Sequence, residues 1–153
     1  MLRVTLNDAL KTAMKAKDQR TTSTLRLILA ALKDRDIAAR GTANSDPISD
    51  EAILEMLQKM VKQRHESIEM YRQGNRADLV TQEQEEIAII EQFLPKQMNE
   101  DELAQAVDAA IAAVGATGIK DMGKTIAALK KDYAGRMDFA KASGVVKRRL
   151  GVA

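Results

Sequence analysis

Eight residues in the last third of the sequence have the spacing of a phosphate-binding loop. Gly118 to Thr125 match the pattern GxxxxGK[ST], in which backbone N–H groups and a lysine hold the phosphates of a nucleotide. Such a loop works where a buried strand leads into it and a helix N-terminus follows it. The residues before Gly118 have helical periodicity, and no apolar strand-like runs follow. We therefore predict that this segment is not a nucleotide site, and no cofactor is expected.

The single histidine is the next candidate for chemistry. His65 is followed by Glu66 and, one helical turn on, by Glu69, a spacing that can pair a proton carrier with a carboxylate. No nucleophile or second ionisable cluster accompanies it. Position 65 also falls between Val61 and Ile68 on the apolar stripe of a predicted helix. The pattern favours a histidine at the edge of a core, and no catalytic residue is predicted.

Basic residues near the C-terminus are the strongest functional candidates. An α-helix turns by about 100° per residue. Counted from Met122 in the apolar stripe, Lys124 and Lys131 therefore point away from the core, and Lys141 and Arg148 do the same on the next helix. The candidate RNA-binding residues are Lys120, Lys124, Lys131, Arg136, Lys141, Lys147, Arg148 and Arg149. The alternative is an ordinary solvated helix face whose last cations complement the helix dipole.

The charge distribution along the chain supports a basic binding surface. The net charge of +2 is the sum of +5 in residues 1–40, −2 in 41–80, −7 in 81–117 and +6 in 118–153. Exposed helix faces usually interleave both signs, so the excess in the last segment favours contact with nucleic acid phosphates. No aromatic ladder is present for stacking bases, and recognition through backbone and shape is expected.

Composition excludes several other classes of protein. The absence of cysteine excludes disulfides and thiolate chemistry, and one histidine excludes a multi-histidine metal cluster, so no metal site is expected. No apolar stretch is longer than Leu27 to Leu32, which is far shorter than the about 20 residues that cross a bilayer, so no membrane association is expected. Lys11, Lys15 and Lys17 are typical of a transit peptide, but Asp8 argues against one, and a cytoplasmic protein is expected.

Seven helices are expected from apolar spacing, caps and breakers. Four run from a Thr5 N-cap to about Lys17, from about Thr21 to Gly41, from a Ser49 N-cap to Gly74, and over Ile87 to Leu94 before Pro95. The fifth begins at Asn99, which forms a capping box with Glu102, and its apolar stripe continues to Val114. The last two run over Met122 to Tyr133 and from Phe139 to Leu150. A loop is expected at Gly41–Pro47. No segment alternates like a strand, so the fold class is all-α.

The tripeptide Leu94-Pro95-Lys96 is the predicted domain boundary. It separates an N-terminal four-helix segment, residues 1–95, from a small C-terminal three-helix domain, residues 96–153. Within the first segment Arg26 and Arg64 fall inside apolar stripes. Each is expected to reach out of the core or to meet a buried acidic or carbonyl partner.

Motifs along nearly the whole chain resemble those of the YqeY-like proteins. They are Met14 to Asp18, Ser23 to Arg26, Lys62 to Arg64 with Ser67 and Ile68, Gly74 to Leu79, Leu94-Pro95, Asp121 to Lys124, Gly135 to Asp138, and Val146-Lys147. The C-terminal part of that family is similar to the tail of GatB, the B subunit of the tRNA-dependent Asp/Glu amidotransferase. The resemblance implies a two-part all-α fold and makes Gly123-Lys124 a helix-start feature.

The resemblance also implies a role beside tRNA. In the amidotransferase the tail helps hold tRNA while other parts perform transamidation, and the family is described as amidotransferase-like, with carbon-nitrogen ligase activity that uses glutamine as amido-N-donor. This chain resembles the tail and lacks the body. The leading hypothesis is a tRNA-binding accessory protein, with Gly123 and Gly135 shaping its turns and with amidotransferase or aminoacyl-tRNA synthetase components as further partners. A helical protein-protein adaptor without RNA binding and an amidotransferase component that needs another subunit stay open.

Overall fold

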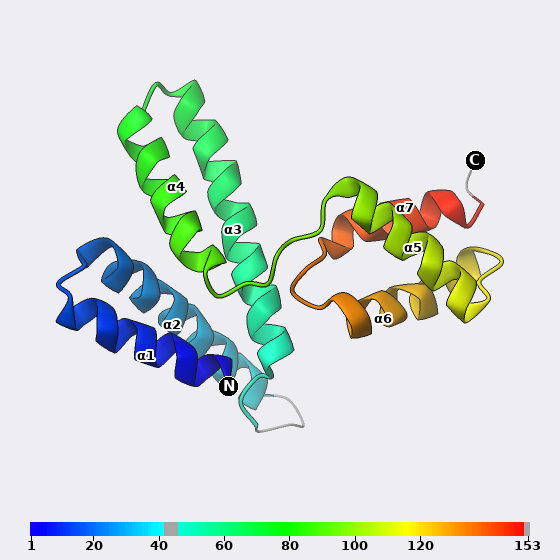
Figure 1. Ribbon diagram of the computed structural model, residues 1–153, viewed down its shortest axis with the longest axis horizontal. Coiled ribbons are helices and arrows are strands. Elements are labelled where there is room, and N and C mark those ends of the chain that lie inside the picture. Colours follow the sequence, from blue (N-terminus) through cyan, green and yellow to red (C-terminus); the bar gives the residue numbers. More distant parts are fainter. Residues whose placement is uncertain (42–45, 152–153) are drawn as a thin grey trace. The chain divides into compact units, whose positions relative to one another are not determined.

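Helices account for all the regular structure that the computed structural model describes, in residues 1–41 and 46–151. These residues form seven α-helices and one short 3-10 helix and contain no strand, which confirms the predicted all-α class (Figure 1). They divide into two compact units, Met1–Pro95 and the chain from Lys96 onward. Each unit has its own apolar core and is described by itself.

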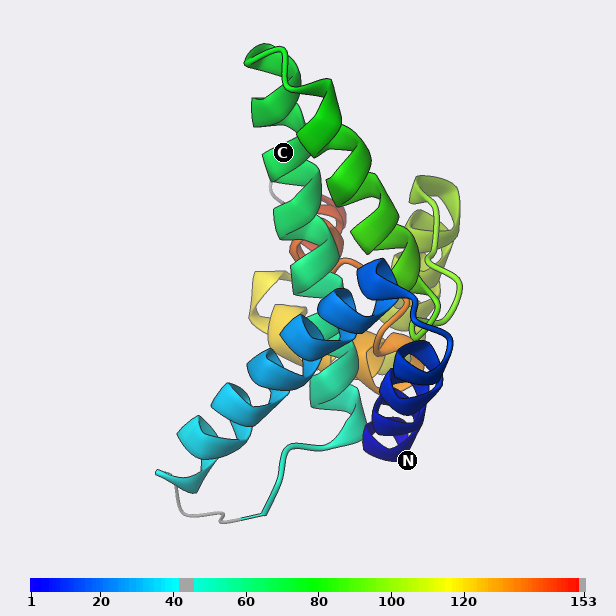
Figure 2. The same ribbon diagram turned by 90° about the vertical axis from the view of Figure 1, so that its left-hand side faces the viewer.

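The first unit consists of two pairs of antiparallel helices, and a short turn joins the two helices of each pair (Figures 1 and 2). Its helices are α1 (Leu2–Lys15), α2 (Gln19–Arg40), α3 (Asp50–Gln73) and α4 (Ala77–Glu91). The core lies where the first half of α3 and the end of α4 meet α1 and α2. Its fully buried side chains include Leu6, Leu25, Ile28, Ile53, Leu57 and Ile90. The outer halves of α3 and α4 pack mainly against each other.

The first helix begins earlier than predicted. α1 starts at Leu2 rather than after Thr5, and it ends at Lys15. Its N-terminus is held by a side chain from α3, because the Asp50 carboxylate pairs with the Met1 ammonium and accepts a hydrogen bond from the Leu2 N–H at 3.2 Å. This long-range partner replaces the local N-cap that the sequence pattern indicated.

The second helix also begins earlier, at Gln19 rather than near Thr21. Asp18 is its N-cap and accepts hydrogen bonds from the Thr21 N–H at 3.1 Å and hydroxyl at 2.7 Å. α2 ends at Arg40. The loop predicted at Gly41–Pro47 includes residues 42–45, which lie outside the described residues. The predicted Ser49 cap of α3 is present, with its hydroxyl accepting from the Ala52 N–H at 3.2 Å.

A partly buried charge cluster joins α3 to α4. Arg64 Nε lies 3.5 Å from Glu86 Oε2 and 4.0 Å from Glu83 Oε2, and the three side chains are only 16%, 10% and 16% exposed. The expectation of a buried acidic partner is therefore confirmed for Arg64. Arg26 fits the other expected alternative, a side chain that reaches out of the core. Arg26 is exposed, because the buried stripe of α2 passes through its neighbour Leu25 instead.

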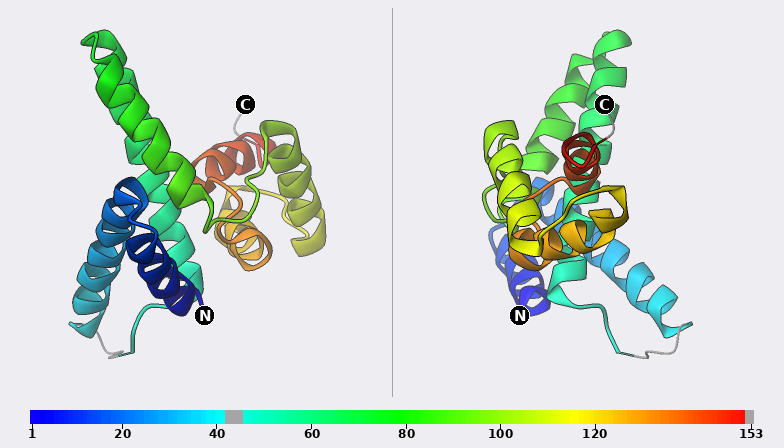
Figure 3. Two further views of the ribbon diagram at one scale, coloured as in Figure 1. Left: turned by 60° about the vertical axis from the view of Figure 1, so that its left-hand side comes forward. Right: turned by 90° about the vertical axis from the view of Figure 1, so that its right-hand side faces the viewer.

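The second unit is a three-helix arrangement (Figure 3). Its elements are α5 (Glu100–Val114), the 3-10 helix η1 (Ile119–Asp121), α6 (Met122–Tyr133) and α7 (Phe139–Arg149). The three α-helices contact one another around a core that includes Val107, Leu129, Met137, Ala142 and Val146. The segment before α5 is tied to the turn between α6 and α7. The Met98 N–H donates to Arg136 O at 2.9 Å, and Gln97 Nε2 donates to Gly135 O at 2.6 Å.

The predicted capping box of the fifth helix is confirmed. The Glu102 N–H donates to Asn99 Oδ1 at 2.8 Å, and the Asn99 N–H donates to Glu102 Oε1 at 3.4 Å. Two backbone donors that have no partner within the helix are thereby satisfied. The box fixes where α5 begins relative to the preceding tied segment.

Replacing the cap of α5 tests its contribution to stability. We expect Asn99→Ala to lower the free energy of unfolding of the second unit by about 1 kcal/mol, because the Glu102 N–H loses its acceptor. Urea unfolding followed by circular dichroism measures the change. Asn99→Asp is the matched control, since it keeps a side-chain oxygen at the cap and should unfold like the parent. An equal loss in both variants would contradict the assigned role.

The Arg64 cluster predicts a pH dependence of stability. Burial raises the pKa of the Glu83 carboxyl above its ordinary value of 4.5, the Glu86 charge raises it further, and Arg64 partly opposes them. The folded chain therefore holds this proton more tightly than the unfolded chain. The contribution of Glu83 is most favourable below pH 4.5 and is lost as the pH rises through the raised pKa.

Glu83→Gln resembles the protonated form at every pH. Its stability relative to the parent should therefore increase as the pH rises from about 4 to 7, as measured by urea unfolding. Glu91→Gln removes one exposed negative charge from the same helix and serves as the control for net charge. A relative stability of Glu83→Gln that falls over this range would show that the attraction of Arg64 outweighs burial.

Candidate functional site

The start of α6 is organised by one carboxylate. Asp121 accepts hydrogen bonds from the backbone N–H groups of Thr117 at 2.9 Å and Gly118 at 3.3 Å, and its backbone carbonyl accepts from the buried Thr125 hydroxyl at 2.9 Å. The two backbone hydrogen bonds, together with the positive charges of Lys124 and Lys120, lower the pKa of Asp121. Asp121 therefore stays ionised and fixes the direction in which α6 leaves the turn.

The loop-like motif differs in structure from a phosphate-binding loop. Backbone N–H groups at Thr117 and Gly118 already have the Asp121 carboxylate as their acceptor. Gly118 leads into η1, and the element before it is α5, whereas a phosphate-binding loop follows a strand. Within the described residues, the geometry that the nucleotide motif requires is missing.

Apolar burial determines where the basic side chains of α6 point. Thr125 and Leu129 are buried, at 0% and 1% exposed, on the face that packs against the other helices of the unit. Lys124 and Lys131 lie on the opposite side of α6 and are exposed, as the helical periodicity predicted. Lys120 precedes α6 on η1 and is also exposed.

The last helix repeats this arrangement. Asp138 caps α7 by accepting from the N–H groups of Ala140 at 3.0 Å and Lys141 at 3.3 Å. Ala142 and Val146 are both 0% exposed, which fixes the rotation of the helix about its axis. The basic side chains of α7 are all exposed, and they are Lys141, Lys147, Arg148 and Arg149.

Two of the predicted RNA-binding residues form ion pairs within the unit. Arg149 Nε lies 2.8 Å from Asp108 Oδ1 of α5, and both side chains are about half exposed. Lys124 Nζ lies 3.6 Å from Asp121 Oδ1, one turn earlier on the chain. These two cations are already partly neutralised by carboxylates.

Arg136 has a structural role in the turn between α6 and α7. Its Nε donates to Lys96 O at 3.3 Å, and its guanidinium carbon lies 5.9 Å from the centre of the Tyr133 ring. The side chain is partly buried. Arg136 therefore helps to tie the start of the unit to this turn, a role that sequence reasoning did not assign to it.

Five predicted site residues remain as unpaired cations. Their side chains are exposed and form no hydrogen bond or ion pair with any residue that the structure describes. They are Lys120, Lys131, Lys141, Lys147 and Arg148, hereafter the α6–α7 basic set. Sequence reasoning missed a sixth cation, Lys130, whose Nζ lies 5.8 Å from the centre of the Phe139 ring.

The predicted turn-shaping glycines differ from each other. Gly135 lies in the turn between α6 and α7 with φ of +80°, a conformation that favours glycine. Gly123 lies in the first turn of α6, a helix start as the resemblance implied, and its backbone angle is not one that favours glycine. Sequence reasoning also missed Gly144, a glycine in the middle of α7. Its signal was a glycine inside a helical pattern flanked by basic residues.

The histidine does not lie at a core edge. His65 is exposed, together with Glu66 and Glu69, because the inward-facing stripe of α3 runs through Arg64 and Ile68. The expected position was therefore wrong. Among the described residues, no group of three or more His, Asp or Glu side chains is arranged to hold a metal ion.

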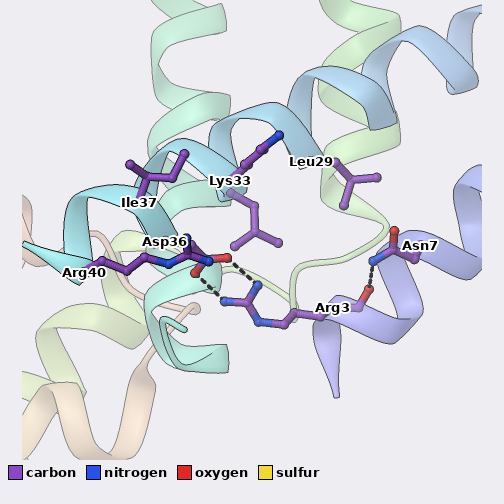
Figure 4. A pocket seen from close by; sticks show the side chains of 8 residues that line it. Arg3, Asn7, Leu29, Lys33, Asp36, Ile37 and Arg40 are labelled. Atoms are coloured by element: carbon purple, nitrogen blue, oxygen red, sulfur yellow. Dashed lines mark hydrogen bonds and ion pairs between the residues drawn. The ribbon is translucent and has the colours of Figure 1, made fainter. Parts of the chain in front are cut away.

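An open hollow of about 300 Å³ lies beside α1 and α2 in the first unit (Figure 4). Arg3 donates two hydrogen bonds of 2.7 Å to the Asp36 carboxylate and one of 3.0 Å to Ile48 O. The hydrogen bonds from Arg3 lower the pKa of Asp36. Lys33 and Arg40 also line the hollow. Because Arg3 and Asp36 pair with each other, we interpret these residues as a structural contact between α1 and α2.

No single helix in the described ranges is both long and apolar enough to span a bilayer. Glu100–Val114 and Ile119–Tyr133 together have the length and apolar composition of a span, but the pair is bent by 98° at its break.

Sequence comparison adds a set of curated relatives. The mitochondrial proteins named "Altered inheritance of mitochondria protein 41" are 37% identical over 89 residues in Lachancea thermotolerans and 35% identical over 106 residues in Eremothecium gossypii. The matches cover 58% and 68% of this chain and 46% and 56% of those proteins. The Saccharomyces cerevisiae protein is 36% identical over 90 residues, with 58% and 46% covered. The chain thus spans about half the length of the curated relatives it matches.

The relatives contradict the expected cellular location, and a family match confirms the resemblance to a known family. Their names are those of mitochondrial proteins, which contradicts the expected cytoplasmic location. The sequence model described as "Yqey-like protein" matches residues 3–150. Because that match covers nearly the whole chain, the protein belongs to the YqeY-like family.

Proposed function

We propose that this chain is a tRNA-binding accessory protein that contacts tRNA phosphates through the α6–α7 basic set. The observation that supports it most is a set of exposed cations that form no hydrogen bond or ion pair with any described residue. Residues 118–153 carry a net charge of +6, whereas the whole chain carries +2, so this segment is more basic than the chain as a whole. Unpaired lysine and arginine side chains on a helical surface are the usual source of affinity for a phosphate backbone.

Aromatic side chains of the unit favour phosphate contact over base stacking. Tyr133 and Phe139 are partly buried against the core of the second unit. Arg136 lies near the Tyr133 ring and Lys130 near the Phe139 ring. Partial burial and a neighbouring cation make both rings poor platforms for a stacked base. Recognition through phosphates and the shape of a folded RNA is therefore the mode that these residues support.

The ion-paired cations have a secondary role in this proposal. The Arg149–Asp108 pair is about half exposed, and such surface pairs contribute only about 0.2–1 kcal/mol. A phosphate can therefore replace Asp108 as the partner of Arg149 at small cost. Lys124 is restrained in the same way by Asp121. Arg136, with its backbone and ring contacts, stays a structural residue.

An accessory role suits the chemistry that the described residues offer. No group of three or more of them could hold a metal ion, and a helix rather than a strand precedes the nucleotide-loop motif. In this proposal a partner protein supplies the catalytic parts of a transamidation reaction. The resemblance to the GatB tail supports tRNA as the RNA and amidotransferase or aminoacyl-tRNA synthetase components as protein partners. The competing function is a helical adaptor whose basic surface meets an acidic protein.

Charge-removal variants test the proposal. We replace Lys131, Lys141, Lys147 and Arg148 by glutamine, which keeps helix propensity and leaves the buried stripe unchanged. Binding of a fluorescein-labelled tRNA transcript is measured by anisotropy between 50 and 300 mM KCl. We expect weaker binding and a flatter plot of log affinity against log salt, by about 0.9 per lost phosphate contact and up to about 3.6 in all.

The matched control removes the same charge from the first unit. Lys11, Lys15, Lys59 and Lys62 are exposed, and their replacement by glutamine should leave most of the affinity and the salt slope intact. Circular dichroism verifies that both variants stay helical. If both quadruple variants lose affinity equally, binding depends on net charge alone. If neither loses affinity, the basic surface is an ordinary solvated face and the adaptor function is favoured.

A further inference from the structure

Gly144 occupies a helical position for which the described structure gives no internal reason. It lies in the middle of α7, where glycine is the poorest helix former other than proline. Its φ is not in the left-handed region, and a Cβ built on it would meet no neighbouring atom within 4 Å. The position is therefore neither a turn nor a close helix contact. An alanine would fit there and would favour the helix.

The surroundings of Gly144 are basic. On an α-helix, residues three and four positions away are neighbours on the same face. For Gly144 these are Lys141 on one side and Lys147 and Arg148 on the other, all exposed and all in the α6–α7 basic set. A side of α7 without a side chain is thus framed by three cations. The buried side of the helix, marked by Ala142 and Val146, faces away from it.

We propose that Gly144 is a phosphate seat, where a phosphodiester group of bound RNA lies directly against the backbone of α7. This inference rests on the RNA binding proposed above and names the point of closest approach. Glycine is the residue that allows a ligand to approach a helix backbone this closely. The three surrounding cations would each donate a charge-assisted hydrogen bond to the same group or to the adjoining phosphates.

Added bulk at position 144 should act on the bound RNA and not on the fold. A methyl group holds the phosphate away from the backbone, and ion-pair energy falls as the separation grows. A leucine side chain would also cover the gap between Lys141 and Arg148. Neither change removes a charge. The effect is therefore separable from the charge-removal variants, which leave the backbone at Gly144 bare.

The test is a pair of substitutions with opposite expected signs. Gly144→Ala should raise the melting temperature, by about 4 °C if the second unit melts on its own, because alanine is the better helix former. It should also weaken binding of the labelled tRNA transcript. Gly144→Leu should lower the affinity about tenfold, roughly the contribution of one charge-assisted contact. Circular dichroism melting and anisotropy measure the two effects on the same full-length chain.

Ala112→Leu is the matched control for added bulk, since Ala112 is an exposed position in the same unit but on α5. It should leave tRNA affinity unchanged. If Gly144→Ala and Gly144→Leu bind the transcript as tightly as the parent while the glutamine variant does not, RNA binding stands and the phosphate seat is wrong. If the quadruple glutamine variant also binds the transcript like the parent, the proposed RNA binding is wrong, and the phosphate seat that rests on it is wrong as well. Equal loss in Ala112→Leu would show a general effect of bulk and overturn the seat.

Discussion

Burial of three apolar helix stripes against one another is the constraint on which the second unit depends. Val107 of α5, Leu129 of α6 and Val146 of α7 are at most 1% exposed and belong to one cluster. Burying each such side chain contributes roughly 1.5–3 kcal/mol, more than any single surface charge provides. Once these stripes face inward, helical geometry leaves no choice for the remaining positions. The basic residues of α6 and α7 must point outward, so the position of the candidate site follows from the core.

Carboxylates then set the ends of these helices and select which cations stay unpaired. Asp121 accepts two backbone N–H bonds before α6 and attracts Lys124, while Asp138 caps α7. Asp108 on α5 pairs with Arg149. Four of the seven acidic residues of the unit, Glu102, Asp108, Asp121 and Asp138, are thus occupied with caps and nearby partners. The cations that remain can neutralise an external anion without breaking an internal contact, which is the physical basis for the proposed role in RNA binding.

Features set by residues close in sequence could be predicted, and features set by distant partners could not. The Asn99–Glu102 capping box and the Ser49 cap depend on three-residue spacing and were predicted correctly. The early start of α1 depends on Asp50, forty-eight residues away from Leu2, and no local pattern encodes it. The pairing of Arg149 with Asp108 was missed for the same reason. The expected cytoplasmic location was argued from a single charge, Asp8, and the mitochondrial names of the relatives contradict it.

The central claim is that the unpaired cations of α6 and α7, rather than the basic residues of the chain in general, contact RNA. Lysine footprinting tests it at every lysine in one experiment, by comparing acetylation rates with and without a saturating tRNA transcript by mass spectrometry. The account predicts strong protection at Lys131, Lys141 and Lys147, and little change at exposed lysines of the first unit such as Lys11 and Lys62. Protection spread evenly over all lysines, or confined to the first unit, would contradict it.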